Sequence, residues 1–387
     1  MGQDRAPEVG TARRRVEWSG APLVDAVEVD AEYGDLLVLD VDGIVSGIDL
    51  ATGVPRTLAT VGQAFDEPPP ENRFHVTPRL GLHADHHGRF AAVAQDFGSA
   101  GVVIDLASGE VVMRLDAGRY HPETVPASLA FIDHPTHGTV LVHRTNWNRL
   151  DATALPSGEC LTSRDFDDDW RSKDCPPLDY FYGAIHPSPS GRWLLSDGWV
   201  WSPVAIPYVI DVVAWLDGDR YRPENDYRGC PFSFGNDWTS PCVWLDDSHV
   251  ALWWKPEANP ADNDWFDGHP LAPLVARGDG AVFILDVEPV RPPGNAAPGL
   301  TALPIPVSAR PQPFDWPVGR LFADGDQLIV YDGESTTLWD YRAGQPTAAC
   351  NAGTPRLLHH GRSTLISFDH EGLIETPLPG SRPDCER

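Results

Sequence analysis

The sequence predicts an all-β fold: a β-propeller of seven four-stranded blades, closed by a strand from the N-terminus. Three observations lead to this prediction. A turn motif built around Asp recurs along the chain, 38 Pro and 35 Gly supply many turns, and no long stretch has a helical hydrophobic period. Four-stranded antiparallel units that repeat every 40 to 60 residues or so are typical of propellers.

The recurring motif consists of two apolar residues, an Asp, an apolar or small residue and then a turn. It reads IDLATG at 48–53 and IDLASG at 104–109. Weaker copies are centred on Asp151, Asp211, Asp286 and Asp340. An apolar strand, a short polar turn and a second apolar strand precede each copy, and this pattern predicts a hairpin.

The blades follow from these repeats. Their first three strands are expected near 22–50, 79–106, 127–153, 180–215, 240–287, 318–341 and 355–377. The last unit lacks a fourth strand, and the segment from Arg14 to Trp18 could supply it, which would join the chain ends and remove an exposed sheet edge. Six or eight blades are the alternatives. We therefore expect one propeller domain at 13–379, between a flexible N-terminus at 1–12 and a tail at 380–387.

These patterns resemble the WD40 and YVTN-like β-propeller families. The resemblance covers roughly residues 15–378 and rests on the hairpin SPSGRWLL at 188–195, the two IDLA turns and the pair Trp339-Asp340. Most copies lack the Gly-His and Trp-Asp signatures of regular WD40 repeats. The resemblance implies a fold and no particular function, because propellers include both scaffolds and enzymes.

Composition excludes several classes of protein. The 387 residues carry 29 Lys+Arg against 56 Asp+Glu, a net charge of -27, which disfavours nucleic acid and anionic membranes as partners. An apolar fraction of 42% excludes wholesale disorder. No secretory signal is visible, and the most apolar stretch, 199–216, is interrupted by Pro and Asp and predicts two strands and a turn.

The cysteines and lysines bear on location and source. The six Cys form no CxxC pair, so we expect reduced thiols in a cytoplasmic protein. Only two of the 29 basic residues are Lys, a skew typical of a GC-rich bacterial genome.

The predicted loops divide the propeller into a plain face and an elaborated face. Turns between the first and second and between the third and fourth strands of each blade are short. Loops on the other face, here called the top face, are long and rich in Trp, and long loops in a compact domain are usually functional. The sequence therefore predicts an aromatic, acidic mouth that binds a ligand. Its predicted ligand-binding residues are Trp147, Trp170, Trp199, Trp201, Trp238, Trp265, Trp316, Asp237 and Asp315. The alternative is that these Trp pin the long loops to the blades.

Signals for metal binding and catalysis are weaker. Asp262, Asp264 and Asp267 alternate ahead of a Gly, as in calcium loops, but the spacing misses the EF-hand by one residue. A divalent cation is therefore only a weak cofactor prediction, and a solvated acidic loop is the alternative. An enzyme would be expected to use His121, Asp237, Lys255 and His269, since top-face His residues stand beside acids that can orient them. His83 and His186 are expected at the opposite, bottom face in structural or surface roles.

The leading functional hypothesis is a non-catalytic binding or scaffold module that recognises a protein, a peptide or a cationic ligand at the top face. The alternative is an enzyme, a hydrolase, lyase or isomerase, that acts on a small molecule at the channel mouth. A carbohydrate-binding propeller is a third idea, which the missing secretion signal weakens.

Overall fold

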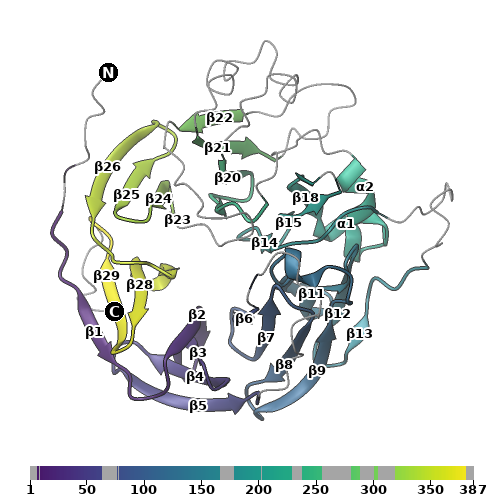
Figure 1. The fold of residues 1–387 in the computed structure, drawn as a ribbon, viewed down its shortest axis with the longest axis horizontal. Coiled ribbons are helices and arrows are strands. Elements are labelled where there is room, and N and C mark those ends of the chain that lie inside the picture. The colour runs from purple at the N-terminus through teal and green to yellow at the C-terminus, as the bar shows by residue number, and fades with distance from the viewer. Residues whose placement is uncertain are drawn as a thin grey trace.

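Seven antiparallel sheets form a ring, with one edge strand of each sheet facing the centre (Figure 1). The structure is a computed structural model. It describes residues 7, 9–62, 76, 78–165, 178–201, 203–228, 238–254, 280–287, 300–303 and 319–380. In these ranges the chain is a seven-bladed β-propeller, as the sequence predicts.

The first three blades follow in chain order. Blade 1 is β2 (Leu23–Ala31), β3 (Gly34–Asp40), β4 (Ile44–Asp49) and β5 (Val54–Thr60). Blade 2 is β6 (Arg79–Ala84), β7 (Phe90–Asp96), β8 (Ala100–Asp105) and β9 (Glu110–Asp116). A short 3₁₀ turn, η1 (Pro122–Thr124), leads to blade 3, which is β10 (Leu129–His134), β11 (Gly138–Asn146), β12 (Arg149–Ala154) and β13 (Glu159–Cys160).

Blades 4 to 7 complete the ring. Blade 4 is β14 (Ile185–Pro187), β15 (Trp193–Ser196) and β18 (Tyr208–Asp211), with a hairpin of β16 (Trp199–Val200) and β17 (Val204–Ala205) and the helices α1 (Val212–Leu216) and α2 (Arg222–Arg228). Blade 5 is β19 (Cys242–Trp244), β20 (His249–Trp254), β21 (Ala281–Asp286) and β22 (Leu300–Leu303). Blade 6 is β23 (Arg320–Asp324), β24 (Gln327–Tyr331), β25 (Thr336–Asp340) and β26 (Gln345–Cys350). Blade 7 is β27 (Leu357–His359), η5 (His360–Arg362), β28 (Thr364–Asp369), β29 (Gly372–Pro377) and β1 (Arg14–Glu17).

The second strand of a blade is buried on both sides because the two adjacent blades cover the two faces of its sheet. In β3, Leu36, Leu37, Val38 and Leu39 are all fully buried. Leu37 and Leu39 pack into the core shared with blade 2, whereas Leu36 and Val38 pack into the core shared with blade 7. Alternate side chains of one strand therefore join adjacent blades.

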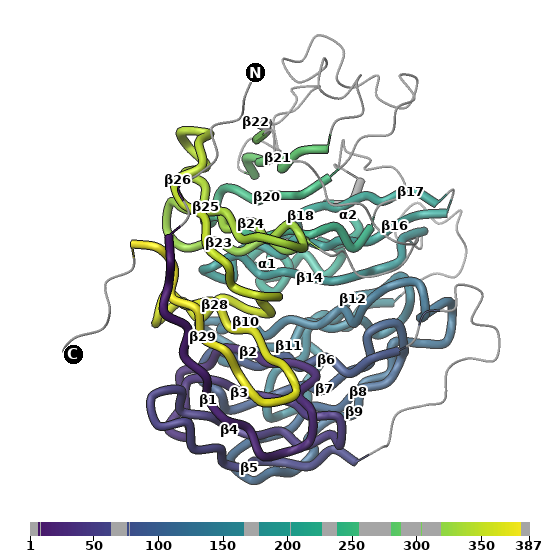
Figure 2. The backbone as a smooth tube through the Cα atoms, turned by 60° about the vertical axis from the view of Figure 1, so that its left-hand side comes forward, coloured from purple at the N-terminus to yellow at the C-terminus, as the bar shows by residue number. Residues whose placement is uncertain are grey.

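The N-terminal strand closes the ring, as the sequence predicts. β1 pairs antiparallel with β29, so that Val16 lies opposite Leu373. Figure 2 shows β1 beside β29 at the outer side of blade 7. Val16 is buried in the core between blades 7 and 1, and the pairing covers an edge of β29 that would otherwise be open.

The Asp of the repeat caps the turn that follows the third strand. The Asp49 carboxylate accepts a hydrogen bond from the Ala51 N–H at 2.7 Å, and Asp105 binds the Ala107 N–H at 3.0 Å in the same way. Asp340 accepts from Ala343 N–H at 2.8 Å. The motif therefore recurs because each strand end leaves amide donors that a short carboxylate can satisfy.

Blade 4 departs from the predicted pattern. The sequence predicts strand and loop where the structure has α1 and α2, and no fourth strand is present among the described residues of this blade. Asp211 begins the change, because its carboxylate accepts a hydrogen bond from Ala214 N–H at 3.1 Å and acts as the N-cap of α1. The same Asp that caps a turn elsewhere starts a helix here.

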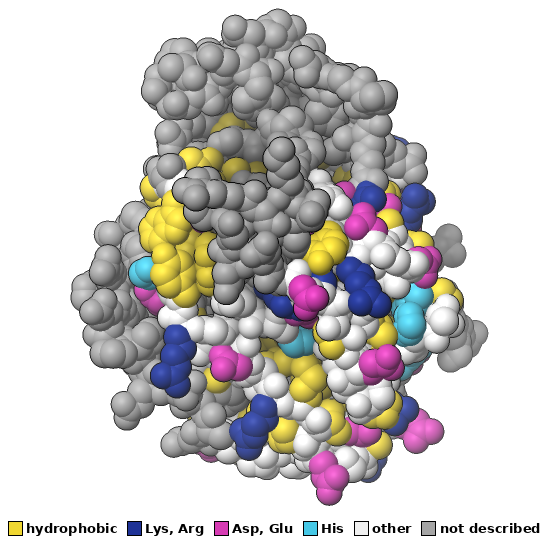
Figure 3. Space-filling model, turned by 90° about the vertical axis from the view of Figure 1, so that its right-hand side faces the viewer, with side chains coloured by type: hydrophobic (Ala, Val, Ile, Leu, Met, Phe, Trp, Pro, Cys, Tyr) yellow, Lys and Arg dark blue, Asp and Glu magenta, His cyan; other side chains and the backbone are white. Residues whose placement is uncertain are grey.

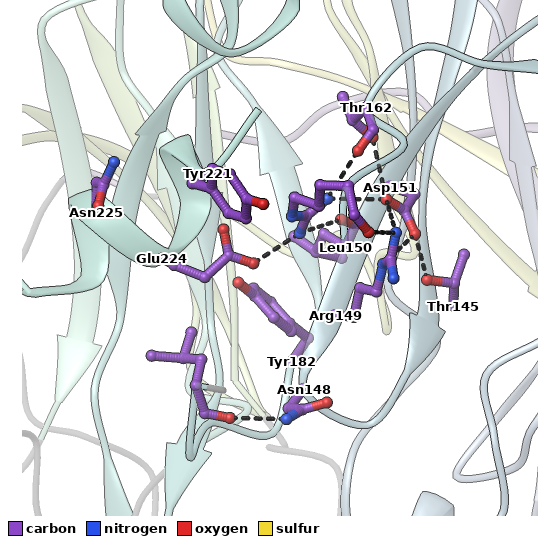
Figure 4. Close-up of polar contacts among 12 residues, drawn as sticks. Thr145, Asn148, Arg149, Leu150, Asp151, Thr162, Tyr182, Tyr221, Glu224 and Asn225 are labelled. Atoms are coloured by element: carbon purple, nitrogen blue, oxygen red, sulfur yellow. Dashed lines mark hydrogen bonds and ion pairs between the residues drawn. The ribbon is translucent and has the colours of Figure 1, made fainter. Parts of the chain in front are cut away.

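The repeat predicts that Asp151 begins a turn, but the structure places Asp151 inside β12. The turn comes three residues later, after Ala154. Its carboxylate binds the buried guanidinium of Arg164 at 2.8 Å, and Arg164 binds Glu224 of α2 at 2.6 Å (Figure 4). The hydroxyl groups of Thr145 and Thr162 also donate to Asp151. This buried network joins blade 3 to the helix that replaces the outer strand of blade 4.

Within the described residues, no helix is long and apolar enough to span a lipid bilayer.

Candidate functional site

Aromatic side chains from five top-face segments meet beside blades 3, 4 and 5. The members are Tyr120, Trp147, Phe181, Trp199, Trp201 and Trp238, here called the aromatic ledge. Tyr120 lies in the loop between blades 2 and 3, and Trp147 lies in the turn between β11 and β12. Residues far apart in sequence converge because all these loops leave the same face of the ring.

Three rings of the ledge form a stacked row beneath the others. Phe181 stacks on Trp199 with ring centres 4.2 Å apart and planes 5° apart. Trp199 stacks in turn on Trp238 at 4.9 Å and 17°. All three side chains are buried, so this row is packed like a core.

Hydrogen bonds hold the row in place. The Trp238 indole N–H donates to the Thr124 carbonyl at 2.8 Å, and the Trp199 N–H donates to the Thr124 hydroxyl at 3.3 Å. Thr124 itself is fully buried in η1. Both buried indole N–H groups therefore have hydrogen-bond acceptors, as buried Trp side chains usually do.

Two rings of the ledge face solvent. Tyr120 is 45% exposed and Trp201 is 44% exposed, although both contact buried members of the cluster. They are the exposed aromatic residues of the described chain; its other large exposed apolar side chains are Val. Figure 3 shows the flank that carries α1 and α2, where hydrophobic side chains gather in patches between scattered charges.

His121 lies at the edge of the ledge. Its Nδ1 is 3.1 Å from Oε1 of Glu123, whose carboxylate is buried, and its ring meets Trp201 edge to face at 5.6 Å. The His121 backbone is left-handed, with φ of 49°, a conformation that non-glycine residues rarely adopt. A carboxylate that orients an imidazole is the arrangement a general base needs.

The structure brings five predicted residues together: Trp147, Trp199, Trp201, Trp238 and His121. As the side chains lie, Trp201 offers surface to a ligand, Trp147 is partly covered, and Trp199 and Trp238 support them from below. Their predicted contact with a ligand is still a prediction. The other predicted residues lie outside the described part of the chain: Trp170, Asp237, Lys255, Asp262, Asp264, Trp265, Asp267, His269, Asp315 and Trp316.

Sequence reasoning missed Tyr120 and Phe181 because it counted only Trp in the long loops. Tyr120 adjoins His121, and Phe181 is the centre of the run Tyr180-Phe181-Tyr182 that ends another long loop. Counting every aromatic residue in these loops would have found both. Trp254, at the end of β20, is buried against Phe283 and belongs to the same core as Trp199 and Trp238.

His186 is corrected by the structure. The sequence predicts it at the bottom face, but its side chain lines a cavity inside the ring together with Thr239 and Arg320. The innermost strand of a blade directs alternate side chains toward the ring centre, so a residue of β14 can point there rather than to a face. Burial lowers the pKa of His186 to about 4.

No described group of three His, Cys, Asp or Glu side chains is arranged to hold a metal ion. Cys160, Cys242 and Cys350 are free thiols. In the ranges given above, the ledge and its edge therefore combine aromatic surface with one carboxylate-oriented histidine.

Comparisons with known proteins bear on the fold. No family model and no curated protein matches the sequence. Among solved structures, the β-propeller domain of Cps50 (Swd1) from Myceliophteria thermophila is similar, with a TM-score of 0.50 and 13% identity over 94% of this chain and 99% of that one. In fold, the chain is a seven-bladed WD40-like β-propeller.

Proposed function

We propose that this protein is a non-catalytic binding module whose top face receives a protein or peptide partner on the aromatic ledge. One observation carries the proposal: Tyr120 and Trp201 are nearly half exposed while they stand on a rigid, fully packed aromatic row. Large aromatic residues supply much of the binding energy at protein interfaces and lose little side-chain entropy when they do so. A WD40-like fold is compatible with a scaffold role but does not by itself assign one.

A partner with a cationic side chain fits the same surface. The faces of Trp201 and Tyr120 can attract Arg or Lys by cation–π interaction, which is worth about 0.5–1 kcal/mol at an exposed site. The net charge of -27 favours the approach of a basic partner over long range.

The test is affinity capture from the native host followed by mass spectrometry, and then calorimetry with each purified candidate partner. The wild-type protein is compared with the Tyr120→Ala, Trp201→Ala double variant. A control variant, Val54→Ala, changes an exposed apolar residue on the outer strand of blade 1. The proposal predicts a partner of defined stoichiometry that the double variant loses and the control retains. Equal capture by all three proteins would refute it.

The alternative is an enzyme that uses His121, because Glu123 orients its imidazole. His121→Asn separates the two hypotheses, since Asn tolerates the left-handed backbone and lacks a basic imidazole. An enzyme would lose turnover of a small molecule with this variant. A binding module would keep its partner.

A further inference from the structure

A cavity of about 240 Å³ lies inside the ring. Polar residues that line it include His186, Asp197, Thr239, Cys242, Arg320 and Arg356. Thr239 follows Trp238 of the ledge directly, and Arg320 and Arg356 stand where the innermost strands of blades 6 and 7 begin. The cavity therefore occupies the top end of the channel.

An arginine recurs at the start of three innermost strands. Arg79 begins β6, Arg320 begins β23, and Arg356 immediately precedes β27. The sequence carries this signal as Thr-Pro-Arg-Leu at 77–80 and again at 354–357, with a third Arg-Leu at 320–321. Because blades 6, 7, 1 and 2 are consecutive around the closed ring, the repeat places three cations along one side of the channel mouth.

Within the described ranges, two of these cations have no anionic partner. Arg79 lies 3.4 Å from Asp96, but neither Arg320 nor Arg356 makes an ion pair within the described part of the chain. The buried Nε of Arg320 has no hydrogen-bond acceptor there. Among the described residues, the Arg356 guanidinium lies over the ring of Phe368, 5.1 Å from its centre.

The charges are close enough to oppose one another. Burial, followed by the charges of Arg356 and Arg79, lowers the pKa of Arg320 to about 10. Burial and the charge of Arg79 lower the pKa of Arg356 as well. Clustered like charges in a partly dehydrated site are costly unless an anion joins them.

Two carboxylates of this region, those of Asp25 and Asp197, accept hydrogen bonds from backbone amides. Asp25 accepts from the N–H groups of Leu82 and Ala26, at 2.8 and 3.0 Å. Asp197 accepts from Thr239 N–H at 2.8 Å. Neither carboxylate is within ion-pair distance of Arg320 or Arg356 in the described residues.

We propose that this cavity binds a carboxylate or phosphate group, with the guanidinium groups of Arg320 and Arg356 as its main donors. Arg is the residue best suited to these planar or tetrahedral anions because its fork of N–H groups matches their oxygens. The Thr239 hydroxyl also lines the cavity and has no hydrogen-bond partner there, so it can add a neutral donor. His186, uncharged near neutral pH, does not add a cation.

The size of the cavity limits the ligand. Its volume is below the range typical of drug-sized ligands, so it suits a small free anion or a single acidic group carried on a polypeptide. This proposal does not depend on the aromatic ledge, and either can fail without the other.

Calorimetric titration of the full-length protein in low-chloride Tris buffer tests the proposal. The free anions are inorganic phosphate and succinate, and the chain-borne acid is the peptide acetyl-Gly-Asp-Gly-amide, with its Asn analogue as the uncharged control. Binding of phosphate or succinate would identify a free anion as the ligand class. Binding of the Asp peptide alone would identify an acid on a polypeptide.

Variants then locate the site. Arg320→Met and Arg356→Met are each expected to weaken anion binding at least tenfold, the loss of one charge-assisted contact. Arg342→Met, which removes an exposed arginine paired with Asp326, should leave binding unchanged. Without anion, the Arg320→Met protein should unfold at the same temperature as wild type or higher, because the variant removes the repulsion between Arg320, Arg356 and Arg79. The rise in Tm that the anion causes in wild type should be absent from the variant.

Two results would overturn the proposal. One is that the wild-type protein binds none of the three anionic probes and shows no anion-dependent Tm. The other is that Arg320→Met and Arg356→Met bind as tightly as wild type. If Arg320→Met does not fold, Arg320→Lys can be used instead. It keeps the positive charge but lacks the paired N–H donors of the guanidinium group, so it is still expected to weaken anion binding.

Discussion

Trp199 stacks face to face on Trp238 with ring centres 4.9 Å apart, although Trp199 lies in β16 of blade 4 and Trp238 lies in the connection before blade 5. Both indoles donate to Thr124, which precedes blade 3. One buried row thus ties together loops from three blades and provides the floor on which Tyr120 and Trp201 are displayed. The buried residues Trp199 and Trp238 support the ledge, whereas Tyr120 and Trp201 are exposed on it. Mutation can therefore test the two roles separately.

Replacing Trp238 by Ala should destabilise the protein by about 3–5 kcal/mol, because it removes a buried ring and leaves a cavity. Trp201→Ala, at the exposed end of the ledge, should cost no more than about 1 kcal/mol. Urea unfolding followed by far-ultraviolet circular dichroism measures both. Equal losses for the two variants would contradict the division between floor and display.

Closure of the ring by β1 should be essential for stability. Val16→Asp places a charge in the core between blades 7 and 1, and we expect a loss of more than about 3 kcal/mol together with aggregation through the exposed edge of β29. Glu17→Gln, an exposed change on the same strand, is the control. Size-exclusion chromatography and thermal unfolding measure the effect. A monomeric Val16→Asp protein of wild-type stability would show that β1 is dispensable.

The buried network around Arg164 should be costly to break and less costly to remove. Arg164→Met leaves the buried Glu224 carboxylate without its cation and leaves Asp151 paired with Arg149 alone, and we expect a loss of about 3–5 kcal/mol. Adding Asp151→Asn and Glu224→Gln removes both charges and should restore part of the stability. Denaturant unfolding of the single and triple variants measures this. A triple variant less stable than Arg164→Met would show that the two carboxylates are not unfavourable once Arg164 is absent.

His359 makes stability depend on pH at the seam between blades 7 and 1. Its Nδ1 lies 3.0 Å from Glu28 and its Nε2 lies 3.4 Å from Asp35. Although burial opposes the charge, these two carboxylates raise the His359 pKa from 6.5 to about 9. Stabilisation by the imidazolium is therefore complete below pH 6.5, the value for the unfolded chain, and is lost as pH rises through about 9.

The carboxylates act in the opposite direction. Burial opposes ionisation of Glu28 and Asp35, but their ion pairs with His359 lower the pKa of both carboxyl groups. Their contribution is present above their ordinary pKa values of 4.5 and 3.8 and is lost as pH falls through the lowered values. Unfolding free energy measured from pH 3 to 10 should fall at both ends.

His359→Gln should flatten the decline on the alkaline side, whereas His370→Gln, at an exposed position, should leave it unchanged. An alkaline limb that is the same in His359→Gln and wild type would show that another group controls it.

Local patterns were sufficient for most of the architecture. The Asp turns, hairpins and apolar runs predict the seven blades and the closing strand, because each strand needs only a period of two and a turn at each end. Asp151 and Asp211 show the limit of that reasoning. The same short motif caps a turn at Asp49, lies within a strand at Asp151 and starts a helix at Asp211, and the surrounding packing selects among these outcomes.

The sequence by itself determined the class of fold, the closure by β1 and the placing of Trp147, Trp199, Trp201 and Trp238 on one face. Only the tertiary structure decided which aromatic rings are buried and which are exposed, because Trp199 and Trp201 are two residues apart on one hairpin and differ only in what packs over them. It also decided that Arg320 and Arg356, 36 residues apart in the printed sequence, line one cavity. The strand pattern depends on neighbouring residues along the chain, whereas burial and charge pairing depend on closing the ring, which brings blade 7 next to blade 1.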